Sequence, residues 1–487
     1  MGRQPPRPAS ARREDHFWTW INHVGVPGMI AAGEQTPSRH RWVVLTVVGV
    51  ALLMVSVDQT SVATALPSLQ ADLQADLSWA SWTITIYSVG QILALPVTGG
   101  ITQRRGPRLV FLVAIIGFTV ASLLCAVTVN LEQLVVCRFV QGVAGGTLMP
   151  AATAIVAVAF GRDRDRGIAL FTSIFPIGAI VGPIAGGVIL SVYSWRGIFL
   201  INIPIGIVVI GAVLAFIGEL PPLHPRPIDL IGVGQLMVTL LGAMAAITQI
   251  DALDGRAMGI VAVAVPALLA GGCGWAFFRR ASKHPNPVVP VGLITARGLR
   301  SMNAINVLFG AAALGFSALI PNYAQVRFGI APLAAGGLLT GRAVGMIATS
   351  TLSVALLRRT GFRPLLLVGF LGIAGGLLMT GLEPTGFGPE LWLLLSSCVL
   401  GLGMGLAGPA ANNAGMHLAP DHTASLTGLR ILFRQVGSIL SVSIATAVTS
   451  ASLHPAATNS WVFFSMAILM VTATVLTFRL PNMRGRW

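Results

Sequence analysis

One carboxylate, Asp58, lies in the second half of a long apolar segment that runs from Trp42 to Leu66. This segment is long enough to cross a bilayer, and a charged Asp near mid-membrane costs about 2.5–3.5 kcal/mol on insertion scales. Acids in such places usually line an ion site, a proton relay or a substrate path. The sequence therefore indicates Asp58 as the first candidate for proton or cation chemistry.

An arginine, Arg138, lies in another apolar segment, and Gln141 follows three positions later. An arginine is too costly to leave facing lipid, so we expect its side chain to point into the protein. Residues three apart share one helix face, which puts Gln141 beside it. A structural role stays open as well, in which Arg138 snorkels to the membrane surface or joins two helices through backbone carbonyls.

The segment GAIVGPIAGG spaces glycines four residues apart. Small residues at this spacing form a smooth strip that lets a second helix approach closely, and the proline within it permits a kink. One explanation of this strip is a helix that bends as the protein works, and the other is ordinary tight packing of helices. The residues of this glycine strip are Gly178, Gly182, Pro183, Gly186 and Gly187.

Other polar and aromatic side chains fall at depths where they could line a substrate pocket. Each has a structural alternative, because Asn and Gln often join membrane helices and Trp often forms an interfacial belt. Aromatic rings could also stack on a cationic drug. The candidates are Trp82, Tyr87, Gln91, Gln141, Asn306, Gln325, Asn412, Asn413 and Arg434.

Deep cations outnumber deep acids in this sequence. Arg138, Arg342, Arg430 and Arg434 fall within or near the ends of apolar segments, whereas Asp58 is the one acid predicted at comparable depth. We expect some of these arginines to bond backbone carbonyls and water. A dication would be bound most easily by two carboxylates, so the shortage of acids favours a monocationic or neutral ligand over a dication.

The composition is that of a polytopic membrane protein. Hydrophobic residues make up 54% of the chain and charged residues 10%, and the mean hydropathy is +0.81. Continuous apolar runs of about 20 residues predict helices, because membrane strands would alternate instead. We count fourteen runs, which begin near Trp42, Trp79, Leu109, Leu131, Gly167, Gly197, Asp229, Met258, Asn303, Leu333, Pro364, Leu391, Ala424 and Trp461. The predicted fold class is all-α, with fourteen transmembrane helices.

The formal charge of +15 does not indicate a nucleic-acid partner, because the basic residues lie between the apolar runs and not on one amphipathic face or motif. Basic loops after the second, fourth, eighth and tenth runs face acid-containing loops on the other side, so the positive-inside rule predicts cytoplasmic termini and a cell-membrane location. The four cysteines show neither a disulfide framework nor a metal-ligand spacing.

The runs group into two six-helix halves with an inserted pair. A weak echo between GGITQRRGPR and VALLRRTGFR supports this, and transporters are often built from such repeats around a mid-membrane site. The stretch from His16 to Ala32 is too short and broken to span a membrane or to be a signal peptide; an interfacial segment and a real beginning at Met29 both stay open. The predicted units are a tail at 1–41, an N-terminal half at 42–218, an insertion at 219–300, a C-terminal half at 301–480 and a tail at 481–487.

Four motifs in order, VDQTSVATALP, RFVQGVAGG, GAIVGPIAGG and WRGIFLINIPIG, resemble the major facilitator superfamily. Within it they are similar to the fourteen-helix drug:proton antiporter branch, which includes bacterial multidrug and quaternary-ammonium exporters. The resemblance covers nearly all of the chain after Arg41. It implies that Asp58 is a protonation or cation-coupling site, that Arg138 assists it, and that the glycine strip shapes the helix that controls closure.

A loop motif departs from the family. GGITQRRGPR has Gln103 where the family usually has an aspartate, although Gly99, Arg104, Gly106 and Arg108 are kept. An acid there would pair with neighbouring arginines and a helix N-terminus, and would hold the cytoplasmic side closed. We expect Gln103 to give a weaker lock.

The resemblance implies a multidrug antiporter that works by alternating access. The proton gradient would drive it without a cofactor, and its partners would be a small-molecule substrate, the proton and the lipid bilayer, with the chain monomeric. Export of an endogenous metabolite, lipid or self-made antibiotic is an alternative, and so is a non-transporting sensor or scaffold. The sequence shows no constellation of nucleophiles or metal ligands that would suggest an enzyme. It also has no ATP-binding loop that would suggest a primary pump. Asp58→Asn is expected to abolish coupled efflux and leave folding nearly intact.

Overall fold

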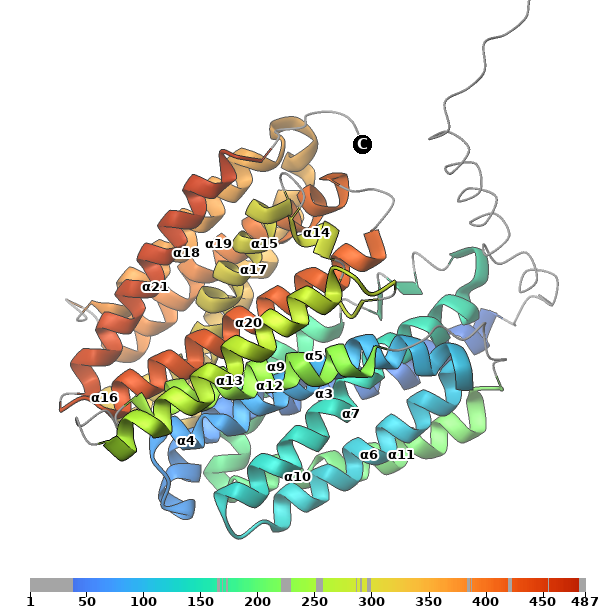
Figure 1. Ribbon diagram of the computed structural model, residues 1–487, viewed down its shortest axis with the longest axis horizontal. Helices are drawn as coiled ribbons and strands as arrows, with labels where there is room; N and C mark the ends of the chain where they lie inside the picture. Colours follow the sequence, from blue (N-terminus) through green and yellow to red (C-terminus); the bar gives the residue numbers. More distant parts are fainter. Residues whose placement is uncertain are drawn as a thin grey trace, which may run out of the picture.

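A computed structural model of the chain describes most of the residues between 38 and 480, and all its regular elements within these ranges are helical (Figure 1). The tails at 1–37 and 481–487 lie outside the described residues. The described ranges are 38–163, 167–168, 170–171, 174–219, 229–250, 257–285, 287–289, 291–295, 299–382, 386, 388–418, 423–453 and 455–480.

The helices up to residue 216 form what we call the N-terminal bundle. Two of its spans are interrupted by a short break, one between α4 and α5 and one between α10 and α11. The elements are α3 (Ser38–Leu73), α4 (Leu77–Ala80), α5 (Trp82–Arg105), α6 (Pro107–Val127), α7 (Leu131–Phe160), η1 (Gly161–Asp163), α9 (Ile174–Val192), α10 (Arg196–Leu200) and α11 (Asn202–Phe216).

The helices from residue 299 onward form the C-terminal bundle, and a helical pair lies between the two bundles in the sequence. The pair is α12 (Leu230–Thr248) and α13 (Ala257–Ala281), followed by the short α14 (Val291–Thr295). The C-terminal bundle comprises α15 (Leu299–Phe309), the π-helical turn η3 (Gly310–Leu314), α16 (Gly315–Phe328), α17 (Pro332–Thr360), α18 (Phe362–Gly381), α19 (Pro389–Leu418), α20 (Thr423–Ser450) and α21 (Pro455–Thr477).

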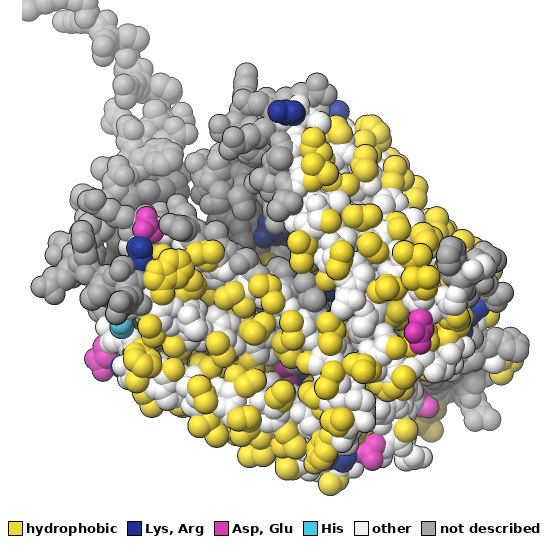
Figure 2. Space-filling view, turned by 180° about the vertical axis from the view of Figure 1, so that it is seen from behind, with side chains coloured by type: hydrophobic (Ala, Val, Ile, Leu, Met, Phe, Trp, Pro, Cys, Tyr) yellow, Lys and Arg dark blue, Asp and Glu magenta, His cyan; other side chains and the backbone are white. Residues whose placement is uncertain are grey.

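The predicted all-α membrane architecture is confirmed. Within the described ranges, twelve helices are long and apolar enough to cross a membrane, and the two remaining predicted runs fall on α9 and α17. Apolar side chains are spread over the described part of the face shown in Figure 2, where charged side chains are few. On α13, for example, Met258 is 84% exposed and Leu268 is 74% exposed. Such a surface is stable only against lipid.

The helical pair α12 and α13 packs on the boundary between the two bundles (Figure 1). Leu236 and Leu240 of α12 join an apolar cluster with Val89 of α5 and Leu429 of α20. The predicted unit boundaries at 42, 219 and 301 stay predictions.

Asp229 ties the beginning of α12 to the end of α13. Its Oδ1 accepts from the Gly232 amide at 3.0 Å and from Arg280 Nε at 2.7 Å. Burial opposes ionisation of Asp229, but these two donors outweigh it and hold the pKa of the carboxyl below its usual value. The ionised acid therefore serves both as a helix cap and as an ion-pair partner.

The two ends of the helix array differ in charge. The acidic end carries Asp72, Asp76, Glu132 and Glu390, and the basic end carries Arg104, Arg105, Arg279, Arg280 and Arg359.

Toward the acidic end the two bundles touch. Ser81 and Thr446 hydroxyls lie 3.0 Å apart, and Gln325 Nε2 donates to the Thr64 carbonyl at 3.1 Å. A Cβ added at Gly336 of α17 would lie 2.2 Å from the Pro183 carbonyl oxygen of α9. Backbones of the two bundles thus approach as closely as glycine permits.

Candidate functional site

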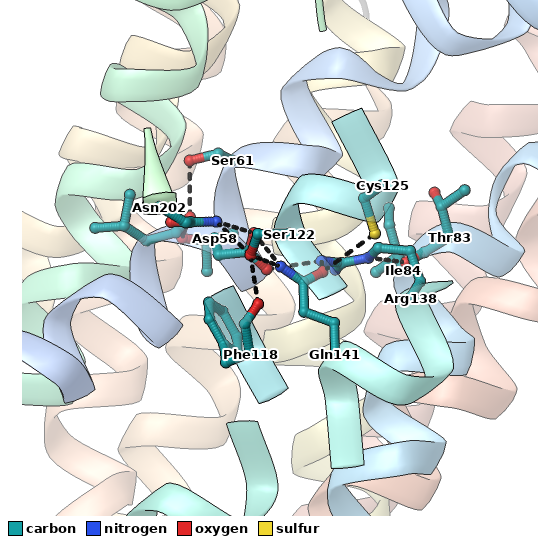
Figure 3. A network of polar contacts seen from close by, with 12 residues as sticks. Asp58, Ser61, Thr83, Ile84, Phe118, Ser122, Cys125, Arg138, Gln141 and Asn202 are labelled. Carbon is teal, nitrogen blue, oxygen red and sulfur yellow. Dashed lines mark hydrogen bonds and ion pairs between the residues drawn. The ribbon is translucent and has the colours of Figure 1, made fainter. Parts of the chain in front are cut away.

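Asp58 sits in the interior of α3 and is only 1% exposed. Its Oδ2 accepts from Arg138 Nη1 at 2.7 Å, and its Oδ1 accepts from Asn202 Nδ2 at 2.7 Å and Gln141 Nε2 at 3.1 Å (Figure 3). Three donors, one of them a cation, offset the loss of water at this buried carboxylate. The acid is therefore bound by three side chains in the middle of the N-terminal bundle.

Arg138 of α7 is fully buried beside Asp58. Its Nε donates to the Thr83 carbonyl at 2.9 Å, and its guanidinium lies 4.2 Å from the Tyr87 ring centroid. Arg138 thus pairs with an acid and also bonds a backbone carbonyl on a neighbouring helix, and a part in proton handling stays a prediction. Its buried Nη2 has no hydrogen-bond partner within the described residues, so one donor group of the guanidinium remains without an acceptor there.

Gln141 connects this ion pair to α6. Its Oε1 accepts from Arg138 Nη1 at 2.6 Å, and its Nε2 donates to Ser122 Oγ at 2.7 Å as well as to Asp58. Cys125 Sγ lies 3.7 Å from the same Oε1 (Figure 3). The predicted placement of Gln141 one turn from Arg138 is confirmed, and its amide bridges the acid, the arginine and α6.

Asn202 and Ser122 belong to this network although the sequence patterns did not single them out. Asn202 begins α11 directly after the break at Ile201, is 1% exposed, and also approaches Ser122 Oγ at 3.4 Å. The one sequence signal for Asn202 is that it lies within the segment WRGIFLINIPIG. Nothing in the sequence sets Ser122 apart from the other serines in apolar segments.

Together, four helices, α3, α6, α7 and α11, bring one acid, one arginine, two amides and a hydroxyl into contact. Hydrogen-bond donors around a carboxylate favour its charged form, so the number of donors in contact with it affects how readily it takes up a proton. Here that number depends on the relative positions of the four helices.

The glycine strip of α9 packs on the same helix that carries Asp58. An added Cβ at Gly178 would lie 2.5 Å from Ser56 Cβ, and one at Gly182 would lie 1.9 Å from Thr60 Oγ1. Ser61 Oγ donates to the Gly182 carbonyl at 2.6 Å. Three of the strip's glycines, Gly178, Gly182 and Gly186, thus lie against α3.

The other side of the strip faces the C-terminal bundle. A Cβ at Gly187 would lie 2.7 Å from Leu333 Cα, and Pro183 contributes the carbonyl that meets Gly336. Helix α9 is consequently in close contact with α3 on one side and α17 on the other. A shift between the bundles would act directly on the helix that holds Asp58.

The predicted gating loop lies at the basic end. Gly106 has φ 80° and forms the turn between α5, whose last turn carries Arg104, and α6. Arg108 approaches Glu219 at 3.9 Å, and no atom would lie within 4 Å of a Cβ at Gly99. Gln103 Oε1 is buried without a hydrogen-bond partner in the described part of the chain, and the weaker lock stays a prediction.

The pocket candidates of the N-terminal bundle mostly join helices. Trp82 Nε1 donates to Thr248 Oγ1 of α12 at 2.8 Å, and Gln91 Oε1 accepts from Gln435 Nε2 of α20 at 3.0 Å. Tyr87 is fully buried against Arg138. Gln91 and Gln325 therefore connect the two bundles in this conformation, and Trp82 anchors α12.

The remaining candidates surround Arg434 of α20. Its Nε donates to Asn306 Oδ1 at 3.1 Å and its Nη2 to Asn412 Oδ1 at 3.4 Å. Asn413 lies on α19, but its side chain is outside the described ones. The structure thus gathers polar groups at two places, around Asp58 and around Arg434.

No group of three or more His, Cys, Asp and Glu side chains that could hold a metal ion occurs among the residues described.

Comparison with known families gives a match over most of the chain. The model of the Major Facilitator Superfamily matches residues 48–442 and, in a second overlapping match, residues 304–486.

Similar bacterial proteins include two with drug-related names. The multidrug transporter protein MdtP of Bacillus subtilis is 27% identical over 418 residues, which span 84% of this chain and 76% of that protein. The multidrug efflux pump LfrA of Mycolicibacterium smegmatis is 29% identical over 384 residues, which span 78% of this chain and 74% of LfrA.

Solved structures agree in fold at low sequence identity. A peptide transporter POT in complex with sulfate superposes with a TM-score of 0.66 at 16% identity, covering 89% of this chain and 93% of POT. The inward-open xylose transporter XylE from E. coli has a TM-score of 0.64 at 13% identity, covering 92% of this chain and 98% of XylE. The helices of this chain therefore share the arrangement of those transporters.

Proposed function

This chain belongs to the Major Facilitator Superfamily, and on that premise we propose that it is a proton-coupled exporter of amphipathic small molecules. The observation that carries the proposal is Asp58, a buried carboxylate held by Arg138, Asn202 and Gln141. The names of MdtP and LfrA support drugs or toxicants as the cargo.

In the proposed cycle Asp58 alternates between a charged and a protonated form. When the bundles shift, at least one donor leaves the carboxylate, and burial then favours the neutral acid. When the donors return, the proton leaves and the charge can attract cargo again. Arg138 is the partner that makes the charged form stable between these steps.

The contacts between the bundles support one assignment of conformation. The Ser81–Thr446 and Gln325–Thr64 bonds and the close approach of α9 to α17 all lie toward the acidic end. By the positive-inside rule the basic end is cytoplasmic. We infer a state that is closed on the outside, in a monomer of the cell membrane with both termini in the cytoplasm.

The glycine strip couples the two events. Because the glycines of α9 let it pack closely against both α3 and α17, separation of α17 at the acidic end would loosen α9 and with it the helix that carries Asp58. Opening to the outside and exchange of the proton would then occur together.

The scarcity of buried acids supports a charge preference. Among the described residues Asp58 is the acid buried within a membrane span, so we propose monocationic or neutral cargo and expect poor transport of dications. The proton gradient supplies the energy, and no cofactor takes part.

The test is dye flux into inside-out vesicles under an imposed pH gradient. The native chain should accumulate monocationic and neutral dyes more than dicationic ones, and Asp58→Asn should lose gradient-driven uptake. Glu132→Gln is the control, because Glu132 is an exposed acid in the first turn of α7. Gradient-driven uptake by Asp58→Asn at the native rate would refute the proposal.

A further inference from the structure

A second charged site occupies the C-terminal bundle. Arg430 and Arg434 stand one turn apart on α20, close enough for the charge of one to act on the other. The neighbours of the Arg434 guanidinium are neutral: the amide oxygens of Asn306 and Asn412, and the Phe309 ring, whose centroid lies 4.4 Å away.

No acid neutralises these two arginines within the described residues. The ion pairs there join Asp58, Asp72, Asp163, Asp229 and Glu219 to other arginines. Arg430 Nε is buried and has no hydrogen-bond partner among the described side chains and backbone. Two like charges four residues apart on a helix repel each other, and burial increases the cost.

The backbone holds Arg434 in a fixed position. A Cβ at Gly310 would lie 1.9 Å from the Arg434 carbonyl oxygen, so α20 rests directly on η3. Asn306 lies on α15 and Asn412 on α19, and their side chains orient the guanidinium from two sides. A cation fixed in this way loses little entropy when it binds an anion.

The groups around Arg434 suit an otherwise apolar molecule that carries a carboxylate. The planar guanidinium fork matches a carboxylate with two parallel hydrogen bonds. Phe309 adds an apolar ring beside the charge. Unlike the fully buried Arg138, Arg434 is only partly buried.

We propose that Arg434, assisted by Arg430, binds the carboxylate of an amphipathic cargo molecule. The cargo range then extends beyond monocations and neutral compounds to carboxylate-bearing and zwitterionic ones. The inference rests on the proposed export function, because it treats this site as part of the cargo path.

The test uses two dyes that differ in one charge, rhodamine B with its free carboxylate and rhodamine B methyl ester. Binding to the purified protein and flux in inside-out vesicles are both measured. The native chain should bind and transport both dyes. Arg434→Gln should weaken binding and flux of the free acid by about tenfold, the loss of one charge-assisted contact, and change those of the ester by less than about twofold.

Two further variants separate charge from folding. Arg434→Lys keeps a cation and should retain part of the affinity for the free acid. Asn412→Asp places a carboxylate beside the guanidinium. This change should weaken binding and flux of the free acid as Arg434→Gln does. Unchanged handling of the ester shows in each case that the protein is folded.

The outcomes decide between this inference and the export function. Equal losses for both dyes in Arg434→Gln, no loss for either, or a native chain that fails to bind the free acid would overturn the carboxylate site. Asp58→Asn should abolish driven flux of both dyes while the Arg434 variants distinguish between them. Driven flux that persists in Asp58→Asn would contradict the proposed coupling and leave the binding difference at Arg434 to be judged separately.

Discussion

The two bundles treat their buried charges differently. In the N-terminal bundle Asp58 and Arg138 neutralise each other at 2.7 Å, and Asn202 and Gln141 complete the network. In the C-terminal bundle Arg342, which is 5% exposed, donates to Ser317, and Arg434 donates to asparagines, with no acid at either among the described residues.

This difference indicates a division of labour. A buried acid–arginine pair carries no net charge, and its acid becomes easier to protonate when a change in geometry moves the arginine away. Arginines without a counter-ion leave a positive region that an anionic group can fill. On this basis the two proposals place the proton in the N-terminal bundle and an anionic part of the cargo in the C-terminal bundle.

The largest expected effect follows from breaking the N-terminal pair. Arg138→Gln leaves Asp58 buried without its cation, which should cost about 3–5 kcal/mol of stability. The deficit should grow as the pH rises, because the stranded acid escapes the penalty only while it holds a proton. Melting of the detergent-solubilised protein over a pH series measures this. A pH-independent loss would show that Arg138 acts by packing alone.

A smaller effect is expected at Asn202. Asn202→Leu removes one donor to Asp58 Oδ1 and should cost about 1–3 kcal/mol. With one donor fewer the protonated acid is favoured, so the pH profile of transport should move to higher pH. Asn459→Leu is the matched control, since Asn459 is also buried but bonds Thr449 in the C-terminal bundle.

The control should lose stability and keep the native pH profile. If both variants moved the profile equally, Asn202 would have no particular role at Asp58.

The smallest effect is expected at Arg342. Its guanidinium has no acid partner in the described region, and its Nε is buried without a hydrogen bond. Arg342→Gln strands no opposite charge, so its stability should stay within about 1 kcal/mol of the native value or increase. Thermal melting beside Arg138→Gln compares the two bundles directly. A loss as large as that of Arg138→Gln would mean that Arg342 has a hidden counter-ion.

Most of the architecture could be predicted from the sequence because lipid leaves few alternatives. Each apolar run became a helix, since backbone groups inside a membrane must be satisfied within the segment. The pairing of Arg138 with Gln141 followed from their spacing of three. Asp58 could be identified because it is the one acid predicted deep within an apolar segment.

The rest of the site depended on contacts between distant segments. Asn202 lies 144 positions after Asp58, and Ser122 meets Gln141 across the α6–α7 interface. A local pattern cannot show which helices become neighbours. Tyr87 is a further example, because its position suggested a pocket wall and its ring instead covers Arg138.

The structure also changes one expectation about folding. The sequence suggested that Asp58→Asn would leave folding nearly intact, but this change leaves Arg138 fully buried without a counter-ion. We now expect a measurable loss of stability, because a stranded buried charge is costly. Flux measurements on this variant therefore need a check that the protein is folded.

Proton exchange at Asp58 is tested most directly by proton release from the purified protein. A monocationic cargo is added to weakly buffered, detergent-solubilised protein, and the change in pH is recorded for the native chain and for folded Asp58→Asn. We predict that the native chain releases protons as the cargo binds and that Asp58→Asn releases none. Equal proton release by the two proteins would contradict the assignment of Asp58 as the coupling site.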